Sequence, residues 1–484
     1  MRENDRIRLG PGERVKLAAT VLVECFTPSN IAGLFSAIDL WPIQPSEYRE
    51  GLKRDIRDWR NSQYGGAWSH VANLARPGVQ LFDASRDSTI AKPIKAVELI
   101  LMSAAPSLTL LVAIFYPDED EFDLSDRLRD DFAMRVDTSR FTVRGRFARL
   151  RALNPWSRAK SASYAINFSV PSHLQREWCR EKFDEFDAYC WHWLSKRAFG
   201  KFAELPPDQR PSVRVIFTED IEPFGPIDDE PVVISAGKPL SERDKERMNR
   251  RRGPLEALGL NGADHVWTSP QRDGFYFSME RDGSPKSSIQ NGIISAQRSA
   301  AQRLIDGEGE YSDNAIISNI ARDFPDIFRV WATEQLLAKY KDDVSAVRDS
   351  SVAPQTALRT AQRLYGFLTS DGHDAAVVAK DVIRIASTDF TYSHLPVFAD
   401  LNEMRFQELQ EDGDAGQIRT LPQHYREALR ENAEIVAAEL ELTTRSIETS
   451  AQLLQAVSAI RLQWASLVVA VIAAAIALIA ILLT

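Results

Sequence analysis

The last twenty residues constrain this chain more than any other feature, because they contain no charged side chain. From Ala465 to Thr484 only Ser466 and Thr484 are polar. A helix of that length covers about 30 Å, the thickness of a bilayer's hydrocarbon core, where only a helix satisfies the backbone groups of a single segment. The segment therefore predicts one C-terminal transmembrane helix. The alternative is a buried core helix.

The residues around this segment predict its orientation and its packing. Arg461 and Trp464 precede the apolar run, and no basic residue follows it. By the positive-inside rule we expect a single-pass, tail-anchored protein whose N-terminal portion lies in the cytoplasm, with the lipid bilayer as a partner. Small residues fall on one helix face and predict helix–helix packing, unless alanine is only a common filler there. They are Ser466, Ala470, Ala473, Ala477 and Ala480.

A heptad pattern precedes the apolar segment and predicts a long membrane-proximal helix, the stalk. No Pro or Gly interrupts the chain between Pro422 and Trp464. Apolar residues recur there at alternating steps of four and three, the coiled-coil period, which favours a homo-oligomer. The alternative is a helix packed on its own domain. The predicted stalk seam consists of Leu429, Val436, Leu440, Ile447, Leu454 and Val457.

The pattern of the rest predicts an α+β or α/β cytosolic domain with a mixed sheet, followed by a helical region, the stalk and the anchor. The chain has 484 residues, enough for about three domains. We place boundaries to give a mainly helical N-terminal segment, a sheet-bearing domain, a helical region, the stalk and the anchor. These are residues 1–91, 92–286, 287–416, 417–463 and 464–484.

Individual elements follow from hydrophobic periodicity and from capping residues. Helices are expected over residues 13–25, 29–40, 47–59, 174–198, 289–305, 312–322, 327–341, 357–368 and 375–385. Strands are expected over residues 97–102, 108–116, 163–170, 213–218, 231–235, 265–269 and 275–279. The strand at 108–116 is almost continuously apolar, which predicts a central strand with both faces covered.

Composition excludes several functions. The net charge of −9 argues against general nucleic-acid binding, which needs a concentrated positive face. Three cysteines without CxxC spacing, Cys25, Cys179 and Cys190, do not form a disulfide framework or a zinc site. The chain has no glycine-rich phosphate loop, HExxH or GxSxG motif. We therefore expect no cofactor, no metal and no enzymatic activity.

Each of four local patterns is either a functional site or an ordinary structural feature. The acidic residues 118–126 follow the strongest strand and are either a cation site or a solvated turn. Cys179, Cys190 and His192 are either a reactive pair or part of an aromatic helix. The segment Asp371–Asp374 is either a metal or base site or a turn, and the basic run 243–252 is either a lipid contact or a solvated helix face.

The order of the predicted parts resembles the CorA-like metal-ion transporters. The likeness lies in RENAEIVAAELELTTRSIETSAQLLQAVSAIRLQWASLVV, Arg430 to Val469, where a long helix enters an apolar segment. That family has two membrane helices and a Gly-Met-Asn signature, and this chain has neither. The resemblance implies a homo-oligomeric stalk, which is pentameric in the family, and not magnesium transport.

Three functional hypotheses follow. The first is a non-enzymatic sensing or protein-interaction protein that self-associates through its stalk and anchor. The second is a divergent CorA-like transporter or pore-forming assembly. The third is a membrane-tethered enzyme whose site is assembled from residues scattered along the chain.

Overall fold

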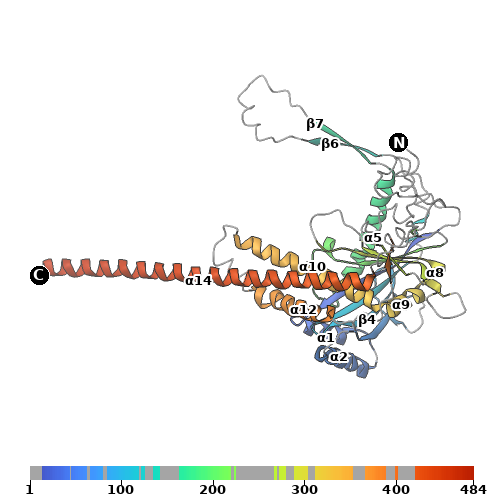
Figure 1. Cartoon of the computed structure of the whole chain (residues 1–484), viewed down its shortest axis with the longest axis horizontal. Helices are drawn as coiled ribbons and strands as arrows, with labels where there is room; N and C mark the ends of the chain where they lie inside the picture. Colours follow the sequence, from blue (N-terminus) through green and yellow to red (C-terminus); the bar gives the residue numbers. More distant parts are fainter. Residues whose placement is uncertain are drawn as a thin grey trace, which may run out of the picture.

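A computed structural model of the chain shows a large mixed sheet flanked by helices, with one long helix leaving it at the C-terminal end (Figure 1). The structure describes residues 14–43, 45–62, 66–79, 84–118, 122–125, 135–141, 163–169, 171–219, 223–224, 266–269, 272–279, 288–303, 311–352, 366–387, 398–401 and 420–483. The strand predicted at 231–235 and residues 357–365 of the helix predicted over 357–368 lie outside these residues.

Ten strands form the main sheet in the order β12-β9-β10-β11-β8-β1-β5-β4-β2-β3. The pairs are antiparallel except β8 with β11 and β2 with β3, which are parallel. The mixed sheet predicted from the sequence is thus confirmed. The strands are β1 Val15–Phe26, β2 Trp68–Ala75, β3 Ser85–Arg86, β4 Ile94–Ala105, β5 Leu108–Pro117, β8 Val213–Thr218, β9 Val266–Ser269, β10 Arg272–Met279, β11 Gly292–Gln297 and β12 Ala399–Asp400.

The centre of the sheet is β1, and the helix predicted over residues 13–25 is wrong. β1 pairs with β5 on one side and β8 on the other, and nearly all of its residues are buried. A strand covered on both faces is apolar at consecutive positions, so its pattern does not alternate and resembles that of a buried helix. The neighbouring strands β4 and β5 confirm the predictions at 97–102 and 108–116.

Helices cover both faces of the sheet. Phe115 and Tyr116 are neighbours on β5, so their side chains point to opposite faces. The Phe115 ring packs edge-on against Trp193 of α5, Pro171–Ser195, at 5.7 Å between ring centroids. The Tyr116 hydroxyl instead lies 3.4 Å from the carbonyl of Asn314 on α9, Asp313–Asp323. The helix α5 thus lies on one face and α9 on the other.

Most of the other predicted helices are confirmed, and a second one is not. The confirmed ones are α1 Ile31–Leu40, α2 Ser46–Asn61, α5, α9, α10 Pro325–Val352 and α12 Asp371–Ala386. The helix predicted over 289–305 is wrong, because its first half is the strand β11 and only α8, Arg298–Gln302, is helical. β11 lies between β8 and β10, and this long-range pairing overrides the local pattern.

Strands from different predicted segments lie side by side. β1, β8 and β11 are adjacent in the sheet, although the sequence places them in the N-terminal segment, the sheet-bearing domain and the helical region. The boundaries drawn near residues 91 and 286 therefore run through one continuous sheet. A separate two-stranded hairpin pairs β6, Arg135–Phe141, with β7, Ser163–Ser169, which is the strand predicted over 163–170.

The last element is α14, Leu421–Leu483, a single helix of 63 residues and about 95 Å. Its N-terminal part packs on α10 and α12, and its C-terminal part extends away from the rest of the molecule (Figure 1). Leu429, Val436 and Leu440 of the predicted stalk seam are buried in this packing, at 2%, 1% and 6% exposed. The alternative of a helix packed on its own domain therefore holds for the first half of the seam. The side chains of Ile447, Leu454 and Val457 lie outside the described ones.

The predicted transmembrane anchor over 464–484 is not supported and is corrected. Within the described part of the chain, no helix has an apolar stretch of the length that a bilayer crossing requires. The described side chains of α14 end at Ala473. The predicted single-pass topology and membrane localisation depend on this anchor and are therefore not supported either. Among the small residues of the predicted anchor face, Ala477 and Ala480 lie beyond these side chains.

Candidate functional site

Charged side chains from three parts of the chain meet at the end of β1. Lys201, which is 4% exposed, lies 2.6 Å from Asp371 and 3.3 Å from Asp374, both on the first turn of α12. Lys339 of α10 lies 3.6 Å from Glu204, and Lys201 lies 3.6 Å from the same carboxylate. We call this set, Lys201, Glu204, Lys339, Asp371 and Asp374, the lysine–carboxylate cluster.

Asp374 is the innermost carboxylate of this cluster and is fully buried. It accepts hydrogen bonds from the Thr27 hydroxyl at 2.6 Å, the Ser29 backbone N–H at 3.1 Å and the Ser29 hydroxyl. Thr27 and Ser29 follow β1, so Asp374 fixes the start of α12 to the turn after the central strand. Buried carboxylates need such donors, because removal from water destabilises the charge.

A second buried carboxylate, Glu24, holds the loop that carries Lys201. Glu24 lies on β1 and accepts backbone N–H bonds from Phe202 at 2.7 Å, Ala203 at 2.9 Å and Cys25 at 3.0 Å. Burial raises the pKa of Glu24 to about 8, against the opposing effect of these donors. Gly200 is required here, since a Cβ would lie 2.5 Å from the Cys25 carbonyl oxygen and 2.7 Å from the Glu24 side chain.

The electrostatics of the lysine–carboxylate cluster are those of an internally paired network. Burial lowers the pKa of Lys201, but the hydrogen bond to Asp371 and the charges of Glu204, Asp371 and Asp374 together raise it above its ordinary value. Burial raises the pKa of Glu204, and the positive charges of Lys201 and Lys339 partly offset this rise. Lys201 is therefore held as a cation by its carboxylates, which suits a structural role rather than a reactive amine.

The sequence identified only part of this cluster. The residues Asp371–Asp374 predict either a metal or base site or a turn. They instead form the first turn of α12, where a spacing of three residues puts both carboxylates on one face. Lys201, Lys339 and Glu24 carried no motif and were missed. The signal available for Lys201 was its position beside Gly200, and that alone does not indicate a contact with α12.

The other sequence patterns give structural roles or lie outside the described residues. Cys179 and Cys190 of α5 are buried, and burial raises their pKa values, to about 12 for Cys179, so neither is a reactive thiolate. His192 is exposed on α5. In the acidic stretch, Asp118 pairs with Arg76 at 2.7 Å. The basic run 243–252 lies outside the described residues. Within the described residues, no group of three metal-ligating side chains could hold a metal ion.

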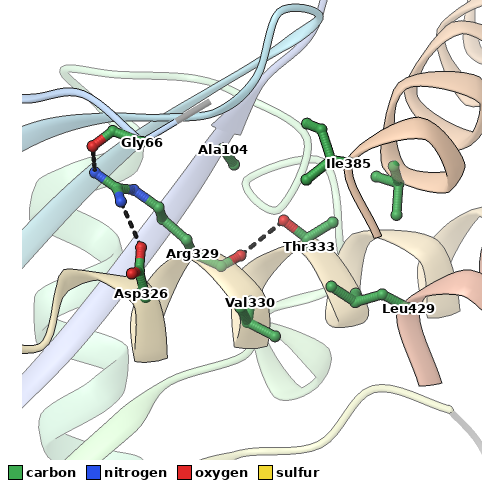
Figure 2. Close-up of a pocket in the computed structure, with 9 residues that line it drawn as sticks. Gly66, Ala104, Asp326, Arg329, Val330, Thr333, Ile385 and Leu429 are labelled. Carbon is green, nitrogen blue, oxygen red and sulfur yellow. Dashed lines mark hydrogen bonds and ion pairs between the residues drawn. The ribbon is translucent and has the colours of Figure 1, made fainter. Parts of the chain in front are cut away.

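A small cavity lies beside Arg329 of α10, near the contact of α10 with α14 (Figure 2). Arg329 is 5% exposed and donates to the carbonyls of Gly66 at 2.6 Å and Ala67 at 3.0 Å, and it also pairs with Asp326. Burial lowers the pKa of Arg329. The cavity of about 20 Å³ has mostly apolar walls, including Leu429 of α14, and has room for about one water molecule.

A larger open groove of about 570 Å³ lies between α12 and α14, where α14 leaves the rest of the molecule. Its ionisable lining residues are Glu441, Arg445 and Glu448 of α14 and His373 of α12. The other lining residues are small or apolar, and they are Leu368, Gly372, Ala376, Ala437, Leu440 and Thr444. We call it the α12–α14 groove.

The part of α14 beyond this groove exposes large apolar side chains. Leu442 is 65% exposed, and Ile460 and Trp464 are 52% and 64% exposed. Leu462, Leu467, Val468, Val469, Val471 and Ile472 are also exposed. We call residues 442–473 the distal part of α14. Contiguous apolar surface on a single chain marks a site of association.

Comparisons of the chain with protein-family models, with curated proteins and with solved structures found no match. The resemblance to the CorA-like transporters therefore gains no support from a relative.

Proposed function

We propose that the protein is a non-enzymatic interaction protein that self-associates through the distal part of α14. The observation that carries this proposal is the exposure of Leu442, Ile460 and Trp464 on a helix that extends away from the sheet and its helices (Figure 1). Burying these three side chains contributes roughly 5 kcal/mol or more per chain before the cost of association, which favours association of the chains.

The sequence of α14 supports a second copy of this chain as the partner. The seam residues Leu429, Val436 and Leu440 pack on the body of the same chain. In the sequence the heptad continues in phase as Ile447, Leu454 and Val457. An apolar stripe of this period is buried when identical helices pack together.

The paired chemistry of the lysine–carboxylate cluster supports the non-enzymatic part of the proposal. Both lysines lie within 3.6 Å of carboxylates, and Asp374 accepts three further hydrogen bonds from Thr27 and Ser29. A catalytic group needs an open position for substrate, whereas these groups bind one another.

The test is the mass of the full-length chain with and without exposed apolar residues. We expect wild type to exceed the 54.4 kDa of one chain in mass photometry and in light scattering. The triple variant Leu462→Gln, Trp464→Gln, Leu467→Gln should shift toward 54.4 kDa with an unchanged circular dichroism spectrum.

A matched control changes exposed polar residues of the same helix, Gln452→Ala and Gln463→Ala, and should keep the wild-type mass. Wild type that remains a single chain at micromolar concentration would refute the proposal. So would a triple variant whose assembly is as large and as stable as that of wild type.

A further inference from the structure

We propose that the cavity beside Arg329 is a binding site for one ordered water molecule, which accepts a hydrogen bond from the Nε–H of Arg329. The site lies where several elements meet, since its lining residues come from β4, α10, α12, α14 and the segment before β2 (Figure 2). The inference rests on the size of the cavity and on the polar atoms of its wall, and it does not depend on self-association.

The size of the cavity limits its ligand to a single small molecule. Its volume of about 20 Å³ exceeds the roughly 10–15 Å³ that one water molecule requires. Pockets that hold an organic ligand have volumes of roughly 300 Å³ or more, so a metabolite does not fit here. Among small molecules, the polar atoms of the wall decide which one is bound.

Two charged side chains of the wall have a polar atom without a partner among the described residues. Arg329 uses its terminal nitrogens for the Gly66 and Ala67 carbonyls and for Asp326, whereas its buried Nε has no acceptor in this part of the chain. Asp326 is 2% exposed and binds Arg329 through Oδ1, and the described residues provide no donor for its Oδ2. A buried polar atom without a hydrogen bond is unfavourable, so an acceptor beside Nε stabilises the folded chain.

The wall also offers acceptors for the hydrogens of a water molecule. The Thr333 hydroxyl lines the cavity and donates to the Arg329 carbonyl at 2.7 Å, so its oxygen can still accept a hydrogen bond. Asp326 Oδ2 is a further acceptor on the wall. Buried waters make two to four hydrogen bonds, and cavities with purely apolar walls stay dry. A donor and acceptors on one wall therefore favour a bound water over a dry cavity.

The charges of the wall favour a neutral ligand over an ion. Arg329 and Asp326 form an ion pair, and the other lining side chains carry no charge. An anion beside Nε would be repelled by the Asp326 carboxylate, and a cation would be repelled by the guanidinium. A water molecule satisfies the Nε–H without introducing an unpaired charge.

The first test is a high-resolution crystal structure of the full-length chain. We expect electron density for one water molecule within hydrogen-bond distance of Arg329 Nε, with the guanidinium still bound to the Gly66 and Ala67 carbonyls. A cavity without density beside Nε would overturn the proposal. Anomalous signal in that position after a bromide soak would also overturn it, because the ligand would then be an anion.

A matched pair of variants tests the site in solution. Val330 lines the cavity, whereas Val344 is buried on the same helix outside the lining, and replacing either by Thr exchanges a methyl group for a hydroxyl of similar size. Either hydroxyl can bond the carbonyl four residues earlier, so this contribution cancels. At position 330 the bound water is an additional partner, so Val330→Thr should lower the thermal midpoint by about half as much as Val344→Thr, or less. Equal losses would show that the cavity is dry and would overturn the proposal.

Discussion

Replacing Asp374 should destabilise the protein strongly, because this carboxylate joins α12 to the turn after β1. It is fully buried and contacts Thr27, Ser29 and Lys201. In Asp374→Ala all of these contacts are lost, and the buried Thr27 hydroxyl keeps only the Asn30 side-chain oxygen, at 3.3 Å, as an acceptor.

The magnitude follows from these contacts. A hydrogen bond to a charged group contributes about 1.5–3 kcal/mol, and removing one partner of a buried ion pair costs about 3–5 kcal/mol. The contributions are not additive, and Lys201 keeps Asp371 at 2.6 Å. We therefore expect Asp374→Ala to lower the free energy of unfolding by about 4 kcal/mol, and Asp374→Asn, which keeps one acceptor oxygen, by about half of that.

Urea unfolding followed by tryptophan fluorescence and circular dichroism measures this loss as a lower transition midpoint. The control is Glu434→Ala, which removes an exposed ion pair with Arg430 on α14 and should leave the midpoint unchanged. A loss below about 1 kcal/mol for Asp374→Ala, with an unchanged slope of the transition, would show that the cluster does not hold α12 in place.

Three further variants test other contacts. Gly200→Ala should lower the free energy of unfolding by about 2 kcal/mol or more, because the added Cβ would clash with the Cys25 carbonyl. The control is Gly51→Ala in helix α2, where nothing lies within 4 Å of the added Cβ, and it should be neutral or slightly stabilising. Thermal melts of both variants measure the difference. Burial raises the pKa of Glu334 on α10 from 4.5 to about 7, so the folded chain holds a proton there that the unfolded chain releases. The stability from this proton is present below pH 4.5 and lost as pH rises through 7, by at most about 3 kcal/mol, and Glu334→Gln should flatten that slope in urea titrations at several pH values. Arg329→Leu should lower the thermal midpoint by several degrees, because the Gly66 and Ala67 carbonyls lose their donor and Asp326 its cation; a midpoint equal to that of wild type would contradict this assignment.

The sequence alone determined the elements whose pattern is local. The uninterrupted heptads predicted a long helix, and α14 is one. The apolar runs at 97–102 and 108–116 predicted strands, and β4 and β5 follow. In these segments the period of the hydrophobic residues and the local propensity agree, so contacts with neighbouring elements add little to the prediction.

Only the tertiary structure decided that β1 and β11 are strands and what surrounds the two ends of α14. β1 and β11 are strands because their partners come from elsewhere in the chain, and a short apolar run cannot be distinguished from a buried helix without those partners. As far as Leu440, the predicted stalk seam of α14 packs against α10 and α12 of the same chain, which cover it there. The absence of charge in the last residues predicted a bilayer anchor, which the described helices do not support.

The lysine–carboxylate cluster shows the same limit most clearly. Asp371 and Asp374 were visible as acidic residues with a suitable spacing, but their partners Lys201 and Thr27 lie 170 and 347 positions away along the chain. Sequence fixes the chemistry of each side chain. Only the fold brings opposite charges within hydrogen-bond distance, because the sheet order places the end of β1, the loop after α5 and the start of α12 at one point.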